Sequence, residues 1–144
     1  MGLVEKVSPD AGITAVGFQV PADAAQLMMV RALTETVALV ADFGIDEATD
    51  IRLAVDEVVS ALIVDAAAGS VIDCTFTASE NTMDVRVAAV TTTAGGPDTN
   101  SFGWHIVSTL TQWVKTESSD YDAAVGGHPT VVEFRWARGG TDVD

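Results

Sequence analysis

Basic residues are scarce in this chain of 144 residues. Seven lysine and arginine side chains stand against 21 aspartate and glutamate side chains, which gives a formal net charge of −14. A surface of that sign repels nucleic-acid phosphates and anionic lipid, so direct binding to DNA, RNA or a membrane surface is disfavoured. A protein partner with a basic surface is the natural complement of such a charge.

Cysteine and long apolar runs are also in short supply. The single cysteine, Cys74, can form neither an internal disulfide nor a thiolate metal cluster, and its alternating apolar surroundings predict a small buried side chain. Asp65 interrupts the longest apolar candidate before it reaches the roughly 18 residues of a membrane span. The sequence does not begin with basic residues followed by an apolar run, so it does not predict a signal peptide. We therefore expect a soluble, cytoplasmic protein with one domain over residues 1–144.

Apolar residues make up 48% of the chain, which is enough to fill a core. Alternating apolar residues predict strands, and spacing by three and four residues predicts helices. The predicted elements are, in chain order, a strand 13–20, helices from 23 to 44 and from 46 to 69, a β-hairpin of 71–78 and 83–91, a helix 102–110, and strands 113–116 and 130–137. This order predicts an α+β two-layer sandwich, with helices on one face of a mostly antiparallel sheet. The ends, 1–11 and 139–144, are expected to fray around an ordered core of about 13–137.

The spacing also predicts which side chains are buried. In the first helix the predicted buried stripe is Leu27, Val30, Leu33, Val37 and Val40. In the second helix it is Ile51, Val55, Val58 or Val59, Leu62 and Ala66. The third helix has helical spacing through Phe102, Ile106 and Leu110. On the second helix Arg52 and Asp56 lie four residues apart, so we expect them to pair.

Three segments together carry a family resemblance. The run Leu53–Ile63 (LAVDEVVSALI) resembles the N-box helix of GHKL-type ATPase domains, in the branch of the RsbW and SpoIIAB anti-sigma-factor serine kinases. Met29–Leu33 (MVRAL) matches the first helix of that branch with its arginine, here Arg31. Phe102–Leu110 (FGWHIVSTL) occupies the place of the glycine-rich G2 segment. The combination looks like the divergent actinobacterial RsbW proteins in particular, and it implies a GHKL (Bergerat) ATPase-like fold.

The resemblance implies a role for each matching residue of the second helix. The family glutamate that matches Glu57 is the base that activates the attacking hydroxyl. The family asparagine that binds Mg²⁺ is matched by Ala61, which has no side-chain oxygen to offer a hard cation. Asp65, a further turn along, is the candidate substitute. Glu57 is accordingly either a remnant of the base or a solvated helix residue.

This chain also departs from the family pattern at the adenine-binding site. Residues 90–98 (VTTTAGGPD) have threonine or valine where the Asp-x-Gly-x-Gly motif has its adenine-binding aspartate. Asp98 is a candidate to take its place through the loop, and Gly103 is what survives of the G2 segment. Loss of the partner of a buried adenine donor costs about 1–3 kcal/mol. We therefore expect ATP and Mg²⁺ to bind weakly or not at all, and no other metal site.

Trp104 and the segment 92–101 can each be interpreted in two ways. Trp104 is either a core aromatic side chain or a side chain that fills the space of a nucleotide. The segment 92–101 lies where the family has its ATP lid, and it is either an interaction loop or plain surface.

Three functions follow from these observations. The resemblance implies an anti-sigma factor that sequesters an alternative, stress- or stationary-phase sigma factor as a homodimer until an anti-anti-sigma protein of the STAS type releases it. Arg31 is then a partner-binding residue, with an ordinary solvated arginine as the alternative. The second function is an active ATP-dependent serine kinase acting on that STAS protein, with Glu57 as base and Asp65 or Asp98 restoring magnesium or adenine binding. The third is an unrelated acidic α+β interaction domain.

Overall fold

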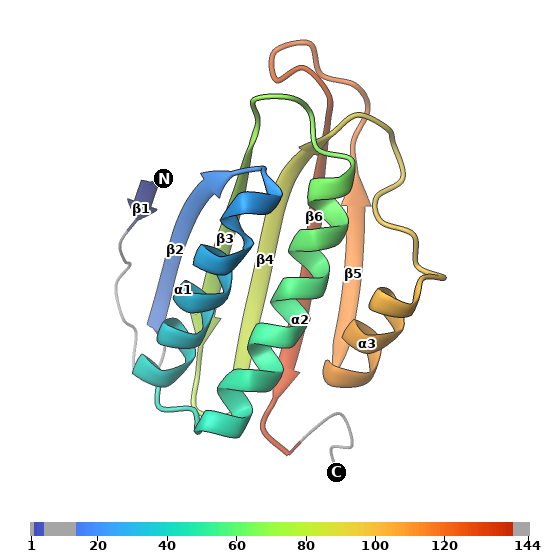
Figure 1. The fold of residues 1–144 in the computed structure, drawn as a ribbon. Helices are drawn as coiled ribbons and strands as arrows, with labels where there is room; N and C mark the ends of the chain where they lie inside the picture. Colours follow the sequence, from blue (N-terminus) through green and yellow to red (C-terminus); the bar gives the residue numbers. More distant parts are fainter. Residues whose placement is uncertain (1, 5–13, 140–144) are drawn as a thin grey trace.

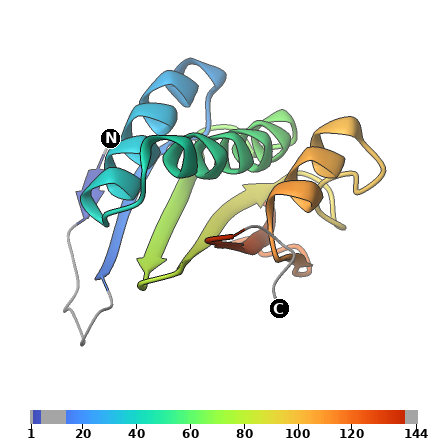
Figure 2. The same cartoon turned by 90° about the horizontal axis from the view of Figure 1, so that it is seen from below.

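One antiparallel sheet, covered on one face by helices, makes up the computed structural model, which describes residues 2–4 and 14–139 (Figure 1 and Figure 2). Its elements are β1 (Gly2–Val4), β2 (Thr14–Pro21), the 3-10 turn η1 (Ala24–Gln26), α1 (Leu27–Val40), α2 (Ile45–Val64), β3 (Val71–Ala78), β4 (Thr82–Thr91), α3 (Phe102–Leu110), β5 (Trp113–Ser118) and β6 (His128–Ala137). The strands lie in the order β1-β2-β3-β4-β6-β5, and every neighbouring pair is antiparallel. The predicted α+β two-layer architecture is confirmed, and it is consistent with a GHKL-like sandwich.

The structure differs from the predicted elements at several ends. Helix α1 covers Leu27–Val40, although a helix from 23 to 44 was predicted. Strand β5 continues to Ser118 instead of 116, and β6 begins at His128 instead of 130. Gly2–Val4 pairs with residues 17–19 of β2, so the expectation that this part of the N-terminal segment frays is wrong. Helix α2 begins at Ile45 and ends at Val64, although we expected it to reach residue 69. The residues after Val64 leave the helix and join the sheet, because the Ala67 amide donates a hydrogen bond to the Val90 carbonyl of β4 at 2.8 Å. Residues 13 and 140–144 lie outside the described residues.

A single hydrophobic core lies between the helices and the sheet. Strand β3 alternates as a half-buried strand should, with Ile72, Cys74 and Phe76 beneath the helices. Burial raises the pKa of the Cys74 thiol to about 12, so this cysteine is a small core side chain, as predicted. No helix in the described part of the chain is long and apolar enough to cross a membrane.

The helices contribute the other half of the core. Five predicted positions of α2 are confirmed, because Ile51, Val55, Val58, Val59 and Leu62 are all buried, whereas Ala66 lies beyond the end of the helix and is half-buried. In α1 the fully buried residues are Val30, Thr34 and Ala38, and the predicted Leu27, Leu33 and Val37 are partly buried against the same core. Val40, also predicted to be buried, is 74% exposed, so this part of the prediction is wrong.

Helix α3 turns a different face to the core than its spacing indicated. Trp104 and Val107 are buried, while Phe102 is 77% exposed. Helix α2 lies between α1 and α3 in both views (Figure 1 and Figure 2). The second half of α2 therefore borders the first turn of α3.

Candidate functional site

The second half of α2 places a row of side chains beside α3. Because Val55, Val58, Val59 and Leu62 face the core, Glu57 and Ala61 lie one turn apart on the flank of the helix. Both line a cavity of about 420 Å³ that Trp104 and Gly103 border from α3. The second half of α2 and the beginning of α3 thus form two walls of one site.

The start of α3 is fixed by its own cap and lies against Glu57. Ser101 has an extended backbone, and its hydroxyl accepts a hydrogen bond from the Trp104 amide at 3.1 Å, as an N-cap residue does. A β-carbon at Gly103 would collide with the Glu57 carboxylate. Glycine is therefore required here by the close approach of Glu57, and the structure brings these two predicted residues together.

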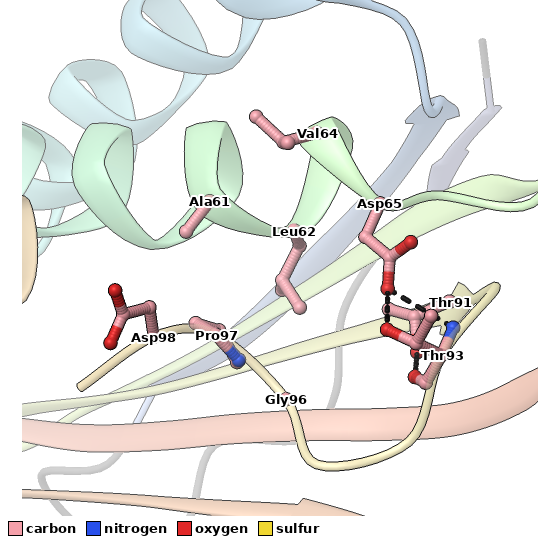
Figure 3. A pocket seen from close by; sticks show the side chains of 9 residues that line it. All are labelled: Ala61, Leu62, Val64, Asp65, Thr91, Thr93, Gly96, Pro97 and Asp98. Atoms are coloured by element: carbon pink, nitrogen blue, oxygen red, sulfur yellow. Dashed lines mark hydrogen bonds between the residues drawn. The ribbon is translucent and has the colours of Figure 1, made fainter. Parts of the chain in front are cut away.

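The loop 92–101 forms the third wall, and Asp65 anchors its beginning. The Asp65 carboxylate accepts hydrogen bonds from the Thr92 hydroxyl, from the Thr93 amide at 3.1 Å and from the Thr93 hydroxyl at 2.6 Å (Figure 3). The Thr92 amide donates to the Asp65 carbonyl at 2.8 Å. The hydroxyl of Thr92 first, and then that of Thr93, lower the pKa of this carboxyl. Asp65 therefore acts as a clip between α2 and the loop.

Asp98 lies further along the same loop. Its carboxylate accepts a hydrogen bond from the Asn100 amide at 2.9 Å, and the Ser101 amide donates to the Asp98 carbonyl at 3.2 Å. Asp98 borders the cavity beside Glu57 and also a second cavity of about 330 Å³ beside Asp65. Figure 3 shows the lining of this second cavity. Ala61 and Pro97 line both cavities as well, so the two spaces adjoin. We refer to the two together as the acidic cleft.

Arg31 lines neither cavity of the acidic cleft and reaches from α1 to α2. Its guanidinium donates to the Asp56 carboxylate of α2 at 2.8 and 3.3 Å, and its side chain is 42% exposed. The bond to Asp56 raises the pKa of Arg31. The predicted pair of Arg52 with Asp56 is wrong, because Arg52 instead faces Glu35 at 3.6 Å.

The residues of the acidic cleft differ from those that the resemblance assigns to Mg²⁺ and ATP. Ala61 stands where the resemblance places an oxygen ligand, and the Asp65 carboxylate accepts hydrogen bonds from two threonines. Thr91, near the position of the adenine-binding aspartate, is 2% exposed, and its hydroxyl pairs with that of Thr130 at 3.0 Å. Among the described residues, no three His, Cys, Asp or Glu side chains gather as a metal site.

Several residues of the cleft were not identified by sequence reasoning. Thr92 and Thr93 hold the loop through their bonds to Asp65, and no motif of the sequence indicated this role. Ser101 caps α3, and a serine directly before an apolar helix is a signal that could have identified it. Nothing in the sequence indicated the pair of Arg31 and Asp56, because its partners are 25 residues apart on different helices.

Comparison with known proteins gives one set of relatives. No protein-family profile matches the chain. The chain is 30% identical over 105 residues to proteins named Anti-sigma-F factor RsbW from two strains of Mycobacterium tuberculosis, CDC 1551/Oshkosh and ATCC 25618/H37Rv. The match covers 73% of this chain and 62% of the length of these curated relatives. The resemblance to RsbW-type anti-sigma factors that the sequence motifs indicated is thereby confirmed.

Proposed function

We propose that this protein is an RsbW-type anti-sigma factor that binds and sequesters an alternative sigma factor. The observation that carries the proposal is the similarity to Anti-sigma-F factor RsbW over 105 residues. The net charge of −14 supports it physically, because a sigma factor needs basic surfaces to bind DNA phosphates. An acidic protein that covers such a surface controls transcription in the cytoplasm without contacting DNA.

The outer surface of α1 and α2 is the proposed site of contact. It presents the Arg31–Asp56 pair beside exposed apolar side chains, among them Met28, Met29 and Leu53. Arginine and methionine are enriched in protein interfaces, and a bidentate pair presents the guanidinium in a defined orientation. An anti-anti-sigma protein of the STAS type would release the sigma factor by competing for this surface, and a homodimer of this chain is the proposed binding unit.

The nucleotide site is proposed to be degenerate, so that regulation does not require phosphorylation of the STAS partner. Support comes from Ala61 at the magnesium position and from the engagement of Asp65 by Thr92 and Thr93. The kinase alternative depends on Glu57 as a base and on Asp65 or Asp98 as a replacement ligand. Titration of the full chain with ATP and Mg²⁺ in a calorimeter separates the two, because binding below millimolar concentrations would favour the kinase.

Co-expression with the sigma factors encoded by the same genome tests the main proposal. We expect one of them to co-purify with this chain at low salt, as an equimolar complex or with two copies of this chain. High salt should weaken the complex, because the screening length falls from about 10 Å at 0.1 M to about 3 Å at 1 M salt. Failure of every such sigma factor to co-purify at low salt would contradict the proposal.

Substitution of Arg31 tests the proposed contact surface. Arg31→Ala should weaken sigma-factor binding by about tenfold, as loss of an interface arginine does. Arg86→Ala is the matched control, because Arg86 is an exposed arginine on the opposite face of the sheet. Equal affinities of the two variants would remove Arg31 from the interface while leaving the anti-sigma function itself to the co-purification experiment.

A further inference from the structure

We propose that the acidic cleft receives a lysine or arginine side chain, flanked by apolar residues, from the protein partner. The identity of that partner as a sigma factor rests on the proposed function. The proposed basic and apolar character of the occupant is inferred from the cleft itself, because its rim is negatively charged and its floor is apolar. The space that would hold a nucleotide in the family is thus used here for a segment of protein.

The rim of the cleft carries negative charge without an internal counter-charge. Glu57 and Asp98 both line the larger cavity, and no lysine or arginine lines either cavity. In the described ranges, every ion pair involves other carboxylates, so these two are left to solvent. On a chain with a charge of −14, an incoming cation meets attraction both locally and at long range.

The floor and the outer edge of the cleft suit the apolar part of such a segment. Trp104 is 7% exposed at the floor, with Ala61 and Pro97 beside it. Val64 lines the same cavity and is 88% exposed. Phe102, between the lining residues Ser101 and Gly103 in the sequence, is 77% exposed. A lysine or arginine stem can lie along such surface while its charged end reaches a carboxylate.

Phosphate is a poor alternative occupant. The beginning of a helix favours anions, but the Glu57 carboxylate already lies against Gly103 in the first turn of α3. Ser101 occupies the Trp104 amide in the same turn. A triphosphate would meet two carboxylates and no basic side chain from the described lining residues, so repulsion opposes its entry.

Titration of the full-length, ¹⁵N-labelled protein with short peptides tests the proposal. The probe is a capped Leu-Lys-Leu peptide, with capped Leu-Glu-Leu and Mg²⁺–ATP as comparison ligands. We expect Leu-Lys-Leu to shift the Gly103 amide signal and the Trp104 indole signal, and neither comparison ligand to do so. Equal shifts with Leu-Glu-Leu, or saturable shifts of these signals with Mg²⁺–ATP, would overturn the proposal.

Charge-matched variants separate the cleft from the overall charge. Glu57→Gln combined with Asp98→Asn should weaken Leu-Lys-Leu binding about tenfold, since partly exposed ion pairs each contribute about 0.2–1 kcal/mol. Asp42→Asn combined with Glu80→Gln makes the same change in charge in two turns that do not line the cleft, and it should leave the affinity unchanged. If the two double variants bind alike, the attraction is a property of the whole chain and the proposal is wrong.

A second pair of variants does not depend on the carboxylates. Val64→Lys brings a competing cation to the edge of the cleft and should reduce binding of Leu-Lys-Leu, whereas Val40→Lys, at a similarly exposed valine of α1, should not. Equal binding by these variants would overturn the proposal. A chain that binds its sigma factor without any change at Gly103 or Trp104 would keep the proposed function and exclude this role of the cleft.

Discussion

The acidic cleft and the uncovered face of the sheet differ in whether the carboxylates compared have a cationic partner. On the uncovered face the Arg135 guanidinium makes a bidentate bond to Asp84 at 2.7 and 2.9 Å. Glu133 on the same face lies between Arg86 at 3.9 Å and Lys115 at 3.6 Å. In the cleft Glu57 and Asp98 have no cationic partner among the described residues.

This difference shows where the charge of the molecule is available to a partner. Paired carboxylates on the sheet are already compensated, so an external cation gains little by approaching them. Unpaired carboxylates over an apolar floor offer both charge and contact area to an incoming basic segment. The acidic cleft is therefore a place where two carboxylates without a cationic partner lie beside an apolar floor.

The largest expected effect comes from the floor of the cleft. Trp104→Ala should lower the free energy of unfolding by about 3–5 kcal/mol, because it leaves a cavity beneath α3. Trp113→Ala removes an aromatic side chain that is 37% exposed on the sheet and should cost about 1 kcal/mol. Urea denaturation of both variants measures the two values, and equal losses would show that Trp104 is not part of the core.

A smaller effect is expected from the clip at Asp65. Asp65→Ala removes the acceptor of three hydrogen bonds and should lower the free energy of unfolding by about 1–2 kcal/mol. Hydrogen exchange at the Thr93 amide should become faster, while exchange in β3 stays unchanged. Unaltered protection of Thr93 would mean that Asp65 does not hold the loop.

The hydrogen bonds of the Asp65 carboxylate also predict that the stability of the protein depends on pH. Because the folded pKa of Asp65 is lowered, its contribution to stability is present above about pH 4, the pKa of an unfolded aspartate, and is lost as the pH falls through the folded pKa. The difference in unfolding free energy between the wild type and Asp65→Asn should therefore shrink in acid. A difference that stays constant between neutral and acid pH would contradict the assigned cause.

The smallest effect is expected on the uncovered face. Asp84→Ala breaks the bidentate pair with Arg135, in which both side chains are 37% exposed, and should cost less than about 1 kcal/mol. It should also leave the shifts produced in the cleft by Leu-Lys-Leu unchanged. A loss larger than that of Asp65→Ala would reverse the order of the two regions.

The sequence was sufficient to predict the three α-helices and five of the six described strands, but not β1. The boundaries predicted for the hairpin and for the helix 102–110 agree with β3, β4 and α3 to within one residue. These elements are set by local periodicity, which is visible along the chain. The end of α2 was missed because the bond from Ala67 to Val90 joins it to a strand more than 20 residues away.

In the candidate site, too, the sequence predicted which residues take part but not which contacts they make. Glu57 and Gly103 were singled out from matching motifs, and Asp65 and Asp98 as substitutes for missing motif residues. The structure gathers all four around one cleft. Their contacts could not be predicted in that way. Asp65 binds the loop, and Arg31 finds Asp56 across two helices, because both bonds depend on how elements pack.

The sequence by itself determined an acidic α+β protein with a buried cysteine, and the resemblance to anti-sigma factors followed from its motifs. Composition and periodicity are sufficient for these properties because each depends on residue type and local spacing. The tertiary structure decided which carboxylates are compensated and which remain open to a partner. That decision belongs to the fold because the attraction between two charges depends on their distance and on the solvent between them, and packing sets both.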